Sequence, residues 1–223
     1  MVKRRLAAIA SAIALCSLFA AAAPASSMAQ DPILFVHGWT ESASLWNTMI
    51  ARFEEDGYPS SYLSAYSYNT SQSNRTDAEK EVKSHVEKLL KATGATKVDI
   101  ISHSMGSLNT RWYVKFVKGG EASVDDWVSL GGPNHGTETA NFCFSTACEE
   151  MRVGSTFLSE LNAGDETPGT VNYGTWWSPC DEIINPDSSV ALSGATNTET
   201  ACMSHTALTT DATVYEQVRE FVK

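Results

Sequence analysis

Basic side chains are scarce in this sequence. Its 223 residues include 16 Lys and Arg against 26 Asp and Glu, which gives a formal net charge of −10 at pH 7. Such an acidic surface repels the phosphate backbone of nucleic acids, and no run of Lys or Arg along the chain offsets that repulsion. We therefore expect no nucleic-acid partner.

Cysteine is also sparse: there are five, and the nearest two, Cys143 and Cys148, are five positions apart. Zinc-binding cysteine pairs are typically separated by about two to four residues, so we expect no metal site. Four cysteines follow the N-terminal segment, which predicts two disulfides in an exported protein, with three pairings permitted. The proximity of Cys143 to Cys148 favours their bond, which leaves Cys180 for Cys202.

Long apolar runs are missing except at the N-terminus. There, three basic residues precede an apolar stretch from 6 to about 23, and small residues follow. This layout is typical of a secretory signal peptide cleaved after Ala25 or Ala29, and a transmembrane anchor is the weaker alternative. We expect residues 1–29 to be removed and the protein to be secreted. Cleavage leaves 13 basic residues against 26 acidic ones, a formal charge of −13.

Internal repeats, low-complexity linkers and composition breaks are absent after this segment, so we expect residues 30–223 to form a single domain. Short apolar runs typical of buried strands alternate with segments that carry apolar residues at helical spacing, which indicates an α/β fold with a mostly parallel sheet flanked by helices. The clearest helix covers 76–95, where Thr76 and Glu79 form a capping-box pattern and Gly94 marks the end. The expected strands are 32–36, 61–68, 97–102, 126–132, 170–177 and 188–194, and further helices are expected in 107–120 and 212–223.

The strand at 97–102 runs directly into SHSMG (102–106) and then into a helix. A turn this tight forces its central residue into a strained backbone conformation, and the small residues around it allow the turn to close. The hydroxyl of Ser104 would then stand above the carboxyl ends of the strands, where ligands bind in such sheets. The pattern S-x-S-x-G thus predicts a nucleophile elbow, against the alternative of a serine-rich turn before an ordinary helix. We expect His103 to be structural and to point away from the base.

A serine nucleophile needs a base that accepts its proton and an acid that holds the base, and after an elbow of this kind the acid and then the histidine follow along the chain. Only His135 and His205 follow Ser104. His205 lies between the last strand and the final helix, where the base belongs. His135 is the weaker candidate, because Asp125 and Asp126 before it lie at the opposite edge of the sheet. We assign His135 to the pocket wall or to bracing a loop.

Asp181 is the expected acid because it follows the strand 170–177 at that strand's carboxyl end. Asp165 precedes the strand and so lies at the wrong edge. Glu182 and Asp187 are rivals, but Glu182 would point oppositely from Asp181, and Asp187 leads into the next strand.

Two N–H groups must stabilise the oxyanion of the tetrahedral intermediate, and Met105 supplies one of them. The first strand ends at His37, Gly38 and Trp39. Gly38 permits a sharp turn that would direct the N–H of Trp39 toward Ser104. We expect His37 to brace this loop by hydrogen bonds to the backbone.

Several stretches together resemble one known family: PILFVHGW, ISHSMGSLNTRWYVK, SLGGPNHGT and STFLSELNAGDETPGTVNY, with the late Asp and His. They are similar to the lipase class 2 family of small secreted bacterial triacylglycerol lipases, and the resemblance covers nearly the whole mature chain. It implies a compact α/β-hydrolase fold with little or no lid. Matched by position, it implies Ser104 as nucleophile, Asp181 as acid, His205 as base, and the N–H groups of Trp39 and Met105 as oxyanion donors. Ser102 stands where many relatives have Ala or Gly, and the bulk of Trp39 implies a narrowed acyl site.

These observations predict a secreted carboxylic-ester hydrolase, a lipase or esterase acting on acyl glycerols through an acyl-enzyme, with no cofactor. An acyltransferase or polyesterase with the same triad is the alternative, and a non-catalytic binding domain on a hydrolase scaffold is a weaker one. We expect a lipid or ester substrate, transient contact with a lipid interface, and a monomer. The segment 138–164 is expected to form the upper wall of the pocket. Further residues expected at the pocket are His37, His103, Asn134, His135 and Trp176.

Overall fold

The computed structural model describes residues 30–223, so the expected signal peptide at 1–29 lies outside the described residues. Six parallel strands form one sheet in the spatial order β2-β1-β3-β4-β5-β6. Their carboxyl ends therefore meet at one edge, where ligands bind in sheets of this kind. The strands are β1 (Ile33–Val36), β2 (Leu63–Tyr66), β3 (Val98–His103), β4 (Val124–Leu130), β5 (Asn172–Trp177) and β6 (Thr196–Glu199).

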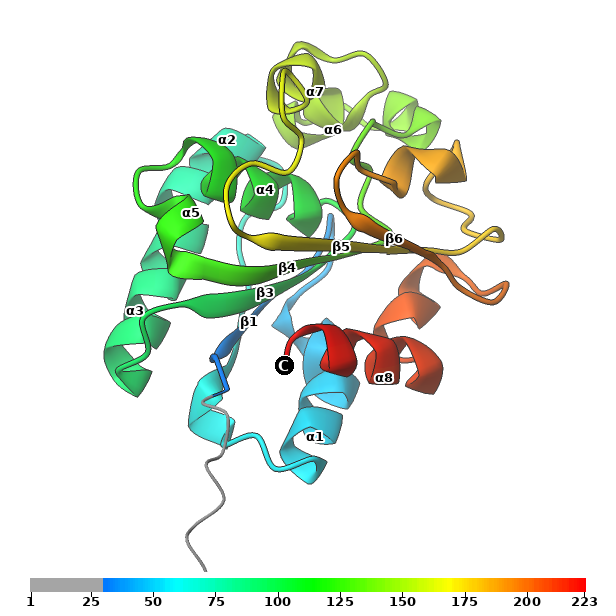
Figure 1. The fold of residues 1–223 in the computed structure, drawn as a ribbon. Coiled ribbons are helices and arrows are strands. Elements are labelled where there is room, and N and C mark those ends of the chain that lie inside the picture. The colour runs from blue at the N-terminus through cyan, green and yellow to red at the C-terminus, as the bar shows by residue number, and fades with distance from the viewer. Residues whose placement is uncertain (1–29) are drawn as a thin grey trace, which may run out of the picture.

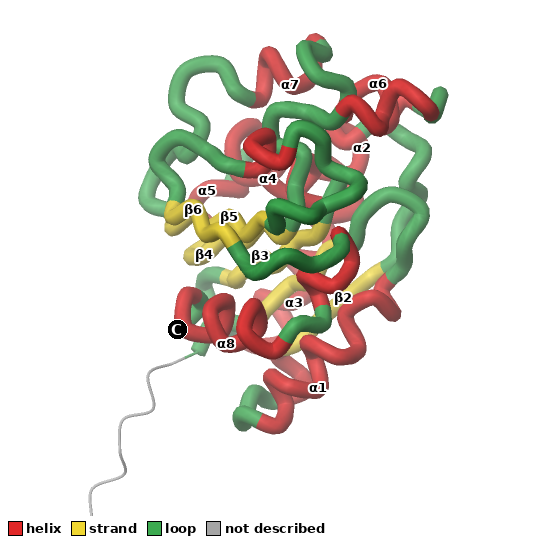
Figure 2. Tube along the Cα trace, turned by 90° about the vertical axis from the view of Figure 1, so that its right-hand side faces the viewer, coloured by secondary structure: helices red, strands yellow, loops and turns green. Residues whose placement is uncertain are grey.

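Helices cover both faces of the sheet. In Figure 1, α1 and α8 lie on one side of the strands and α4 on the other, with α6 and α7 outside α4. Figure 2, a quarter-turn away, shows the same strands between α8 and α4. The helices are α1 (Asn47–Glu55), α2 (Asn74–Asp77), α3 (Lys83–Thr93), α4 (Gly106–Phe116), α5 (Gly120–Ser123), α6 (Thr146–Met151), α7 (Thr156–Leu161) and α8 (Ala212–Phe221), and a π-helical turn (Ala78–Val82) joins α2 to α3.

The central strands are buried on both faces because successive side chains of a strand point in opposite directions. In β1, Leu34 and Val36 belong to the apolar cluster shared with α3 and α4, while Ile33 and Phe35 belong to the cluster shared with α1 and α8. All four are fully buried, and each such side chain stabilises the fold by roughly 1.5–3 kcal/mol. This double burial explains why the strand reads as a continuous apolar run.

Two sequence predictions about elements are wrong. The segment 188–194 forms no strand: Asp187–Val190 is a 3-10 turn, and the last strand is β6, whose residues are polar and mostly exposed. Because β6 lies at the edge of the sheet, it needs no apolar face. The long helical segment also begins earlier than predicted, because Ser73 rather than Thr76 caps it, its hydroxyl accepting the N–H of Arg75.

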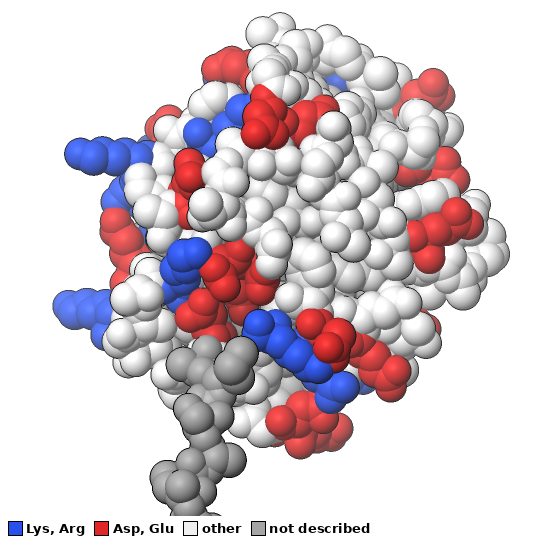
Figure 3. Space-filling view, in the orientation of Figure 1, with Lys and Arg blue, Asp and Glu red and all other residues white. Residues whose placement is uncertain are grey.

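The surface carries charges of both signs. On the face shown in Figure 3, acidic and basic side chains are interspersed around a largely uncharged centre, so this face presents no continuous positive surface. Within residues 30–223, no helix combines the length and the apolar composition that a membrane span requires.

Candidate active site

Ser104 occupies a strained turn between β3 and α4. Its φ is +53°, in the left-handed region that residues with a side chain rarely adopt. Glycines allow the chain to close around it: a Cβ at Gly106 would lie 2.6 Å from the main chain at the end of β1, and one at Gly38 would lie 2.6 Å from the Ser104 Cβ. Ser102, the first residue of the S-x-S-x-G pattern, fits here because its hydroxyl donates to the carbonyl of Val128 at 2.7 Å. The structure therefore has the backbone geometry expected of an elbow.

His205 begins a 3-10 turn (His205–Thr209) and meets Asp181, which lies in the loop after β5. Its Nδ1 lies 2.7 Å from Asp181 Oδ2, while Asp181 Oδ1 accepts the N–H groups of Ile183 and Ile184. A carboxylate accepts, so Nδ1 carries the proton and Nε2 of the neutral ring has a free lone pair. Nε2 is buried with no hydrogen-bond partner among the described residues, and His205 and Ser104 line the same cavity.

A disulfide and the hydrogen bonds of Ser178 join the loops that carry Asp181 and His205. The structure forms the two disulfides predicted from the sequence, Cys143–Cys148 and Cys180–Cys202. The second bond links the residue before Asp181 to the segment before His205. The hydroxyl of Ser178 joins the same loops, since it donates to the Met203 carbonyl at 2.6 Å and accepts the Met203 N–H at 2.9 Å.

The environment sets the protonation of both groups. Burial lowers the pKa of His205 and His103 lowers it further, against the opposing effect of Asp181. Burial alone would raise the pKa of Asp181, but the hydrogen bond and charge of His205 and the main-chain N–H groups lower it on balance. At neutral pH the pair is therefore a neutral imidazole beside a carboxylate, the state that a general base requires.

The loop after β1 brings Trp39 to the cavity beside Ser104. A tight turn spans Gly38 to Glu41, with the Glu41 N–H on the Gly38 carbonyl at 3.3 Å. Thr40, inside this turn, has a φ of +60°. Among residues 30–223, Thr40 and Ser104 are the non-glycine residues with a positive φ, and both lie at this cavity.

Two acidic residues without a role in the sequence predictions contact the site. Glu41 Oε2 accepts the Gly38 N–H at 2.7 Å and lies 2.9 Å from His103 Nδ1. Glu182 Oε2 accepts the main-chain N–H of His205 at 3.0 Å, so it holds the main chain of His205 in place. The sequence signal for the role of Glu41 was its position three residues after Gly38, because a short turn brings its side chain back to the glycine N–H.

The expectation that His103 points away from the base is wrong. Its ring centroid lies 4.5 Å from that of His205, and its Nε2 lies 3.2 Å from the His205 carbonyl oxygen. The cause is tertiary: the 3-10 turn that begins at His205 places its main chain against the His103 side chain at the end of β3.

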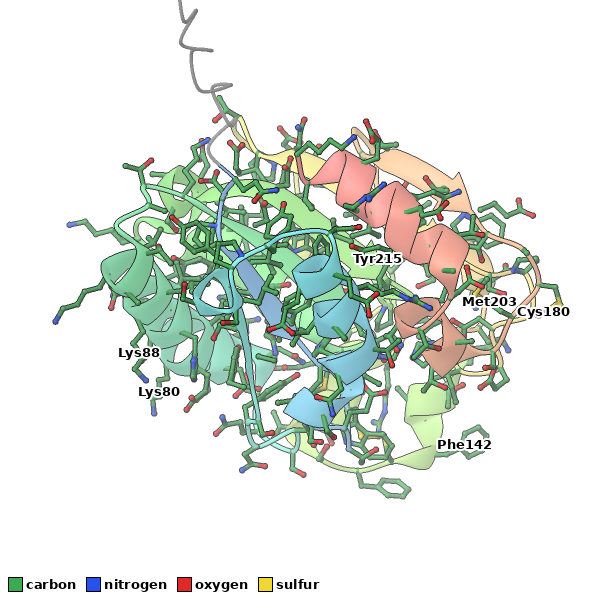
Figure 4. All side chains as sticks on the ribbon, turned by 90° about the horizontal axis from the view of Figure 1, so that it is seen from below. Lys80, Lys88, Phe142, Cys180, Met203 and Tyr215 are labelled. Carbon is green, nitrogen blue, oxygen red and sulfur yellow. A yellow bond between two sulfur atoms is a disulfide. The ribbon has the colours of Figure 1, made fainter. Side chains whose placement is uncertain are left out.

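A cavity of about 430 Å³ opens beside Ser104. Its walls include Met151, Ile183 and Ile184, and Phe142 lies at its outer part with 83% of its surface exposed. Figure 4 shows the Phe142 ring projecting from the edge of the molecule. Phe144 is exposed to 85%. An apolar cavity whose lining includes an exposed aromatic side chain suits an acyl chain.

The five further residues predicted at the pocket do not line this cavity: His37, His103, Asn134, His135 and Trp176. His37 is fully buried, and its Nδ1 lies 2.9 Å from the Gly38 carbonyl, which is the bracing contact predicted for it. Asn134 is fully buried as well and donates to the Val190 carbonyl. His135 braces a loop through its contact with Glu166.

The assignment of Trp176 to the pocket is wrong. Its side chain lies on the face of the sheet that α1 and α8 cover, where its Nε1 donates to Gln217 of α8. The segment 138–164 forms the pocket wall only in its first part, through residues such as Ala140 and Met151. Phe157 is buried instead, stacked on Trp112 of α4.

One cluster of three carboxylates among the described residues could hold a metal ion. Asp31, Asp99 and Asp125 bring their oxygens within 4.8 Å of one another. They lie at the amino ends of the strands, at the opposite edge of the sheet from Ser104, and Lys97 already pairs with Asp125 at 2.6 Å. This cluster therefore lies apart from the cavity beside Ser104.

Known proteins resemble this chain in sequence. Residues 30–222 match the family described as Lipase (class 2). The triacylglycerol lipase of Burkholderia plantarii is 28% identical over 129 residues, which cover 55% of this chain and 35% of that protein. The triacylglycerol lipase of Pseudarthrobacter phenanthrenivorans is 41% identical over 58 residues, 26% of this chain and 17% of that protein. The matches thus span about a third or less of the length of these curated relatives.

Solved lipase structures share the fold. The mature Bacillus licheniformis lipase BlEst2 superposes with a TM-score of 0.78 at 16% identity, over 91% of this chain and 96% of that one. Aspergillus fumigatus lipase B gives a TM-score of 0.69 at 16% identity, over 83% of this chain and 51% of that one. Likeness at such low identity shows the fold alone, which is the α/β-hydrolase fold.

Proposed function

The chain belongs to the lipase class 2 family, and from this membership we propose that it is a secreted carboxylic-ester hydrolase, a lipase or esterase that cleaves acyl glycerols. One observation carries the proposal. His205, bonded to Asp181 through Nδ1, shares a cavity with the strained Ser104 and has no partner for its Nε2 among residues 30–223. A nucleophile, a base and an acid need this relation to act together.

In the proposed reaction, the Ser104 oxygen attacks the ester carbonyl carbon while His205 Nε2 accepts the hydroxyl proton. The tetrahedral intermediate then expels the alcohol, which takes that proton from His205, and the acyl group stays on Ser104. Water attacks the acyl-enzyme by the same steps, releasing the acid and restoring the serine. Asp181 fixes the tautomer of His205 and stabilises the imidazolium that forms.

The N–H groups of Trp39 and Met105 are the proposed donors to the oxyanion. Met105 is the N-cap of α4, so its N–H lies at the positive end of the helix dipole. Trp39 belongs to the turn that contacts Ser104 through Gly38. Loss of one such donor typically costs on the order of 3 kcal/mol of transition-state stabilisation.

The cavity and the cysteines support the substrate class and the location. The apolar walls and the exposed Phe142 and Phe144 suit an acyl chain delivered from a lipid surface. Two disulfides fit an oxidising compartment, as expected if residues 1–29 direct export. An acyltransferase or polyesterase would use the same groups, and product analysis with an added alcohol separates the acyltransferase from the hydrolase.

The direct test is Ser104→Ala, which removes only a hydroxyl from a turn whose shape the backbone sets. We expect this variant to fold normally and to lose nearly all hydrolysis of p-nitrophenyl esters from acetate to palmitate and of a triglyceride emulsion. A fluorophosphonate should label Ser104 in the wild-type protein. A variant that keeps a tenth of the turnover, or a label on another residue, would refute the assignment.

A further inference from the structure

Glu41 closes the turn that carries Trp39. Its Oε2 accepts the Gly38 N–H at 2.7 Å, and the Glu41 N–H reaches the Gly38 carbonyl at 3.3 Å. Inside this turn Thr40 has a φ of +60°. A β-branched residue in that conformation costs on the order of 1–3 kcal/mol, so it persists only where its neighbours fix it. The carboxylate of Glu41 supplies that constraint beside Ser104.

The same Glu41 oxygen lies 2.9 Å from His103 Nδ1, and His103 Nε2 lies 3.2 Å from the His205 carbonyl oxygen. A carbonyl oxygen only accepts, so Nε2 is the donor to His205, and Nδ1 faces the carboxylate of Glu41. Burial alone would raise the pKa of Glu41, but the contacts with His103 and the Gly38 N–H lower it on balance and keep it ionised. Both ring nitrogens of His103 therefore contact the site, one through Glu41 and one through the main chain of His205.

A continuous series of contacts connects the oxyanion loop, the turn from Gly38 to Glu41 that carries Trp39, to His205. Gly38 is bonded to Glu41, Glu41 to His103, and His103 to the main chain of His205. We propose that Glu41 and His103 form a positioning couple that holds the oxyanion loop and the main chain of His205 as one unit. This inference rests on the proposed function, because it concerns how that site is held in its working geometry.

The carboxylate of Glu41 makes the two members of the couple interdependent. Glu41 lines the same cavity as Ser104, and its side chain is 18% exposed while that of His103 is fully buried. A carboxylate at this position without its contact to His103 would repel the oxyanion. Loss of His103 alone should therefore harm catalysis more than loss of both members of the couple.

The test uses three variants of the full chain: Glu41→Gln, His103→Asn and the double variant. Glu138→Gln is the matched control, since Glu138 is exposed near the cavity and does not line it. The measurements are kcat and KM on p-nitrophenyl butyrate, the melting temperature, and the fraction of Ser104 labelled by a fluorophosphonate. The labelled fraction corrects kcat for any unfolded protein.

We expect Glu41→Gln to lower kcat by about tenfold to a hundredfold, less than the loss of an oxyanion donor itself, because Glu41 acts through the position of that donor. KM should change by less than about threefold, since the ground-state contacts are kept. His103→Asn should lower kcat further, and the double variant should recover at least about threefold of that loss. The Glu138→Gln control should stay within about twofold of the wild type.

Spectra of the wild-type protein with ¹⁵N-labelled histidine supply a measurement that does not depend on a variant folding. Nε2 of His103 should carry a proton because it donates to the His205 carbonyl, whereas in His205 the proton lies on Nδ1. A His103 ring without a proton on Nε2 would overturn the inference, as would a Glu41→Gln kcat equal to that of Glu138→Gln in an active enzyme. A wild-type protein without esterase activity would instead refute the proposed function, and the inference with it.

Discussion

Asp181 is held in a single orientation by the main chain around it. Its Oδ1 accepts two backbone N–H groups, from Ile183 and Ile184, and its Oδ2 faces His205. In Asp181→Asn the amide oxygen must stay on those N–H groups, so the amide nitrogen faces His205 Nδ1 and forces the wrong tautomer. We expect turnover of a soluble ester to fall by about 10³–10⁴-fold, with the fold intact by circular dichroism.

The matched control is Asp187→Asn, because the Asp187 side chain bonds only the next residue's N–H, that of Ser188. Its turnover should stay within about twofold of the wild type. A larger loss at Asp187 than at Asp181 would place the acid one loop later.

The pH dependence of activity follows from the lowered pKa of His205. Burial, assisted by His103, disfavours the imidazolium, so the ring stays neutral to a lower pH than an exposed histidine would. In the proposed reaction the neutral ring is the base, so kcat/KM on a soluble ester should be flat near neutrality and fall only as the pH drops through that lowered pKa. We expect the midpoint of the acid limb to lie below about 6.5, the ordinary imidazole value. A midpoint at or above that value would contradict the burial argument.

For single residues, the sequence predicts the location of side chains that follow the end of a strand. It does not predict side chains that reach the site through tertiary contacts. Ser104, Asp181 and His205 each follow a strand, and the structure brings them to one edge. The contacts of Glu41 and Glu182 depend on where their loops meet His103 and His205, which no local spacing encodes.

At the scale of elements, the disulfide Cys180–Cys202 joins the loops that carry Asp181 and His205, and its two cysteines lie 22 positions apart in sequence. On the chain-entropy model, closing a ring of this size stabilises the fold by roughly 3 kcal/mol. The double variant Cys180→Ser with Cys202→Ser should therefore melt about 6–12 °C lower. Turnover should fall by less than an order of magnitude, because Ser178 still joins the loops through Met203. Unchanged turnover below the melting transition would show that the disulfide has no part in aligning Asp181 with His205.

The last strand shows why one element could not be predicted. Val190 and Leu192 read as a buried strand because they are apolar and alternate, and both are buried, yet neither joins the sheet. β6 is polar, and Asn197 fixes the turn before it by donating to the Leu192 carbonyl and accepting the Leu192 N–H. Edge strands bury little, so their sequences carry a weak apolar signal.

For the molecule as a whole, the alternation of buried strands and helices was enough to predict a parallel α/β sheet, because parallel strands need crossover helices that cover both faces. The shape of the cavity was not predictable in the same way. Its wall comes from separate loops, represented by Trp39, Phe142 and Ile183, which meet only in the folded protein.

Hydrogen bonds and a disulfide hold the part of the wall between Thr137 and Arg152, so we expect it not to act as a large mobile lid. Thr137 donates its N–H to the Met151 carbonyl at 2.9 Å, the Arg152 guanidinium donates to the carbonyls of Ala140 and Cys143, and Cys143 is bonded to Cys148. With the segment closed on itself, the cavity beside Ser104 is accessible without an interface. The rate on a short-chain triglyceride, followed by acid release at constant pH, should therefore rise smoothly through the solubility limit. A soluble p-nitrophenyl ester in the same buffer is the control, and a sharp increase once the emulsion forms would show that the wall opens as a lid.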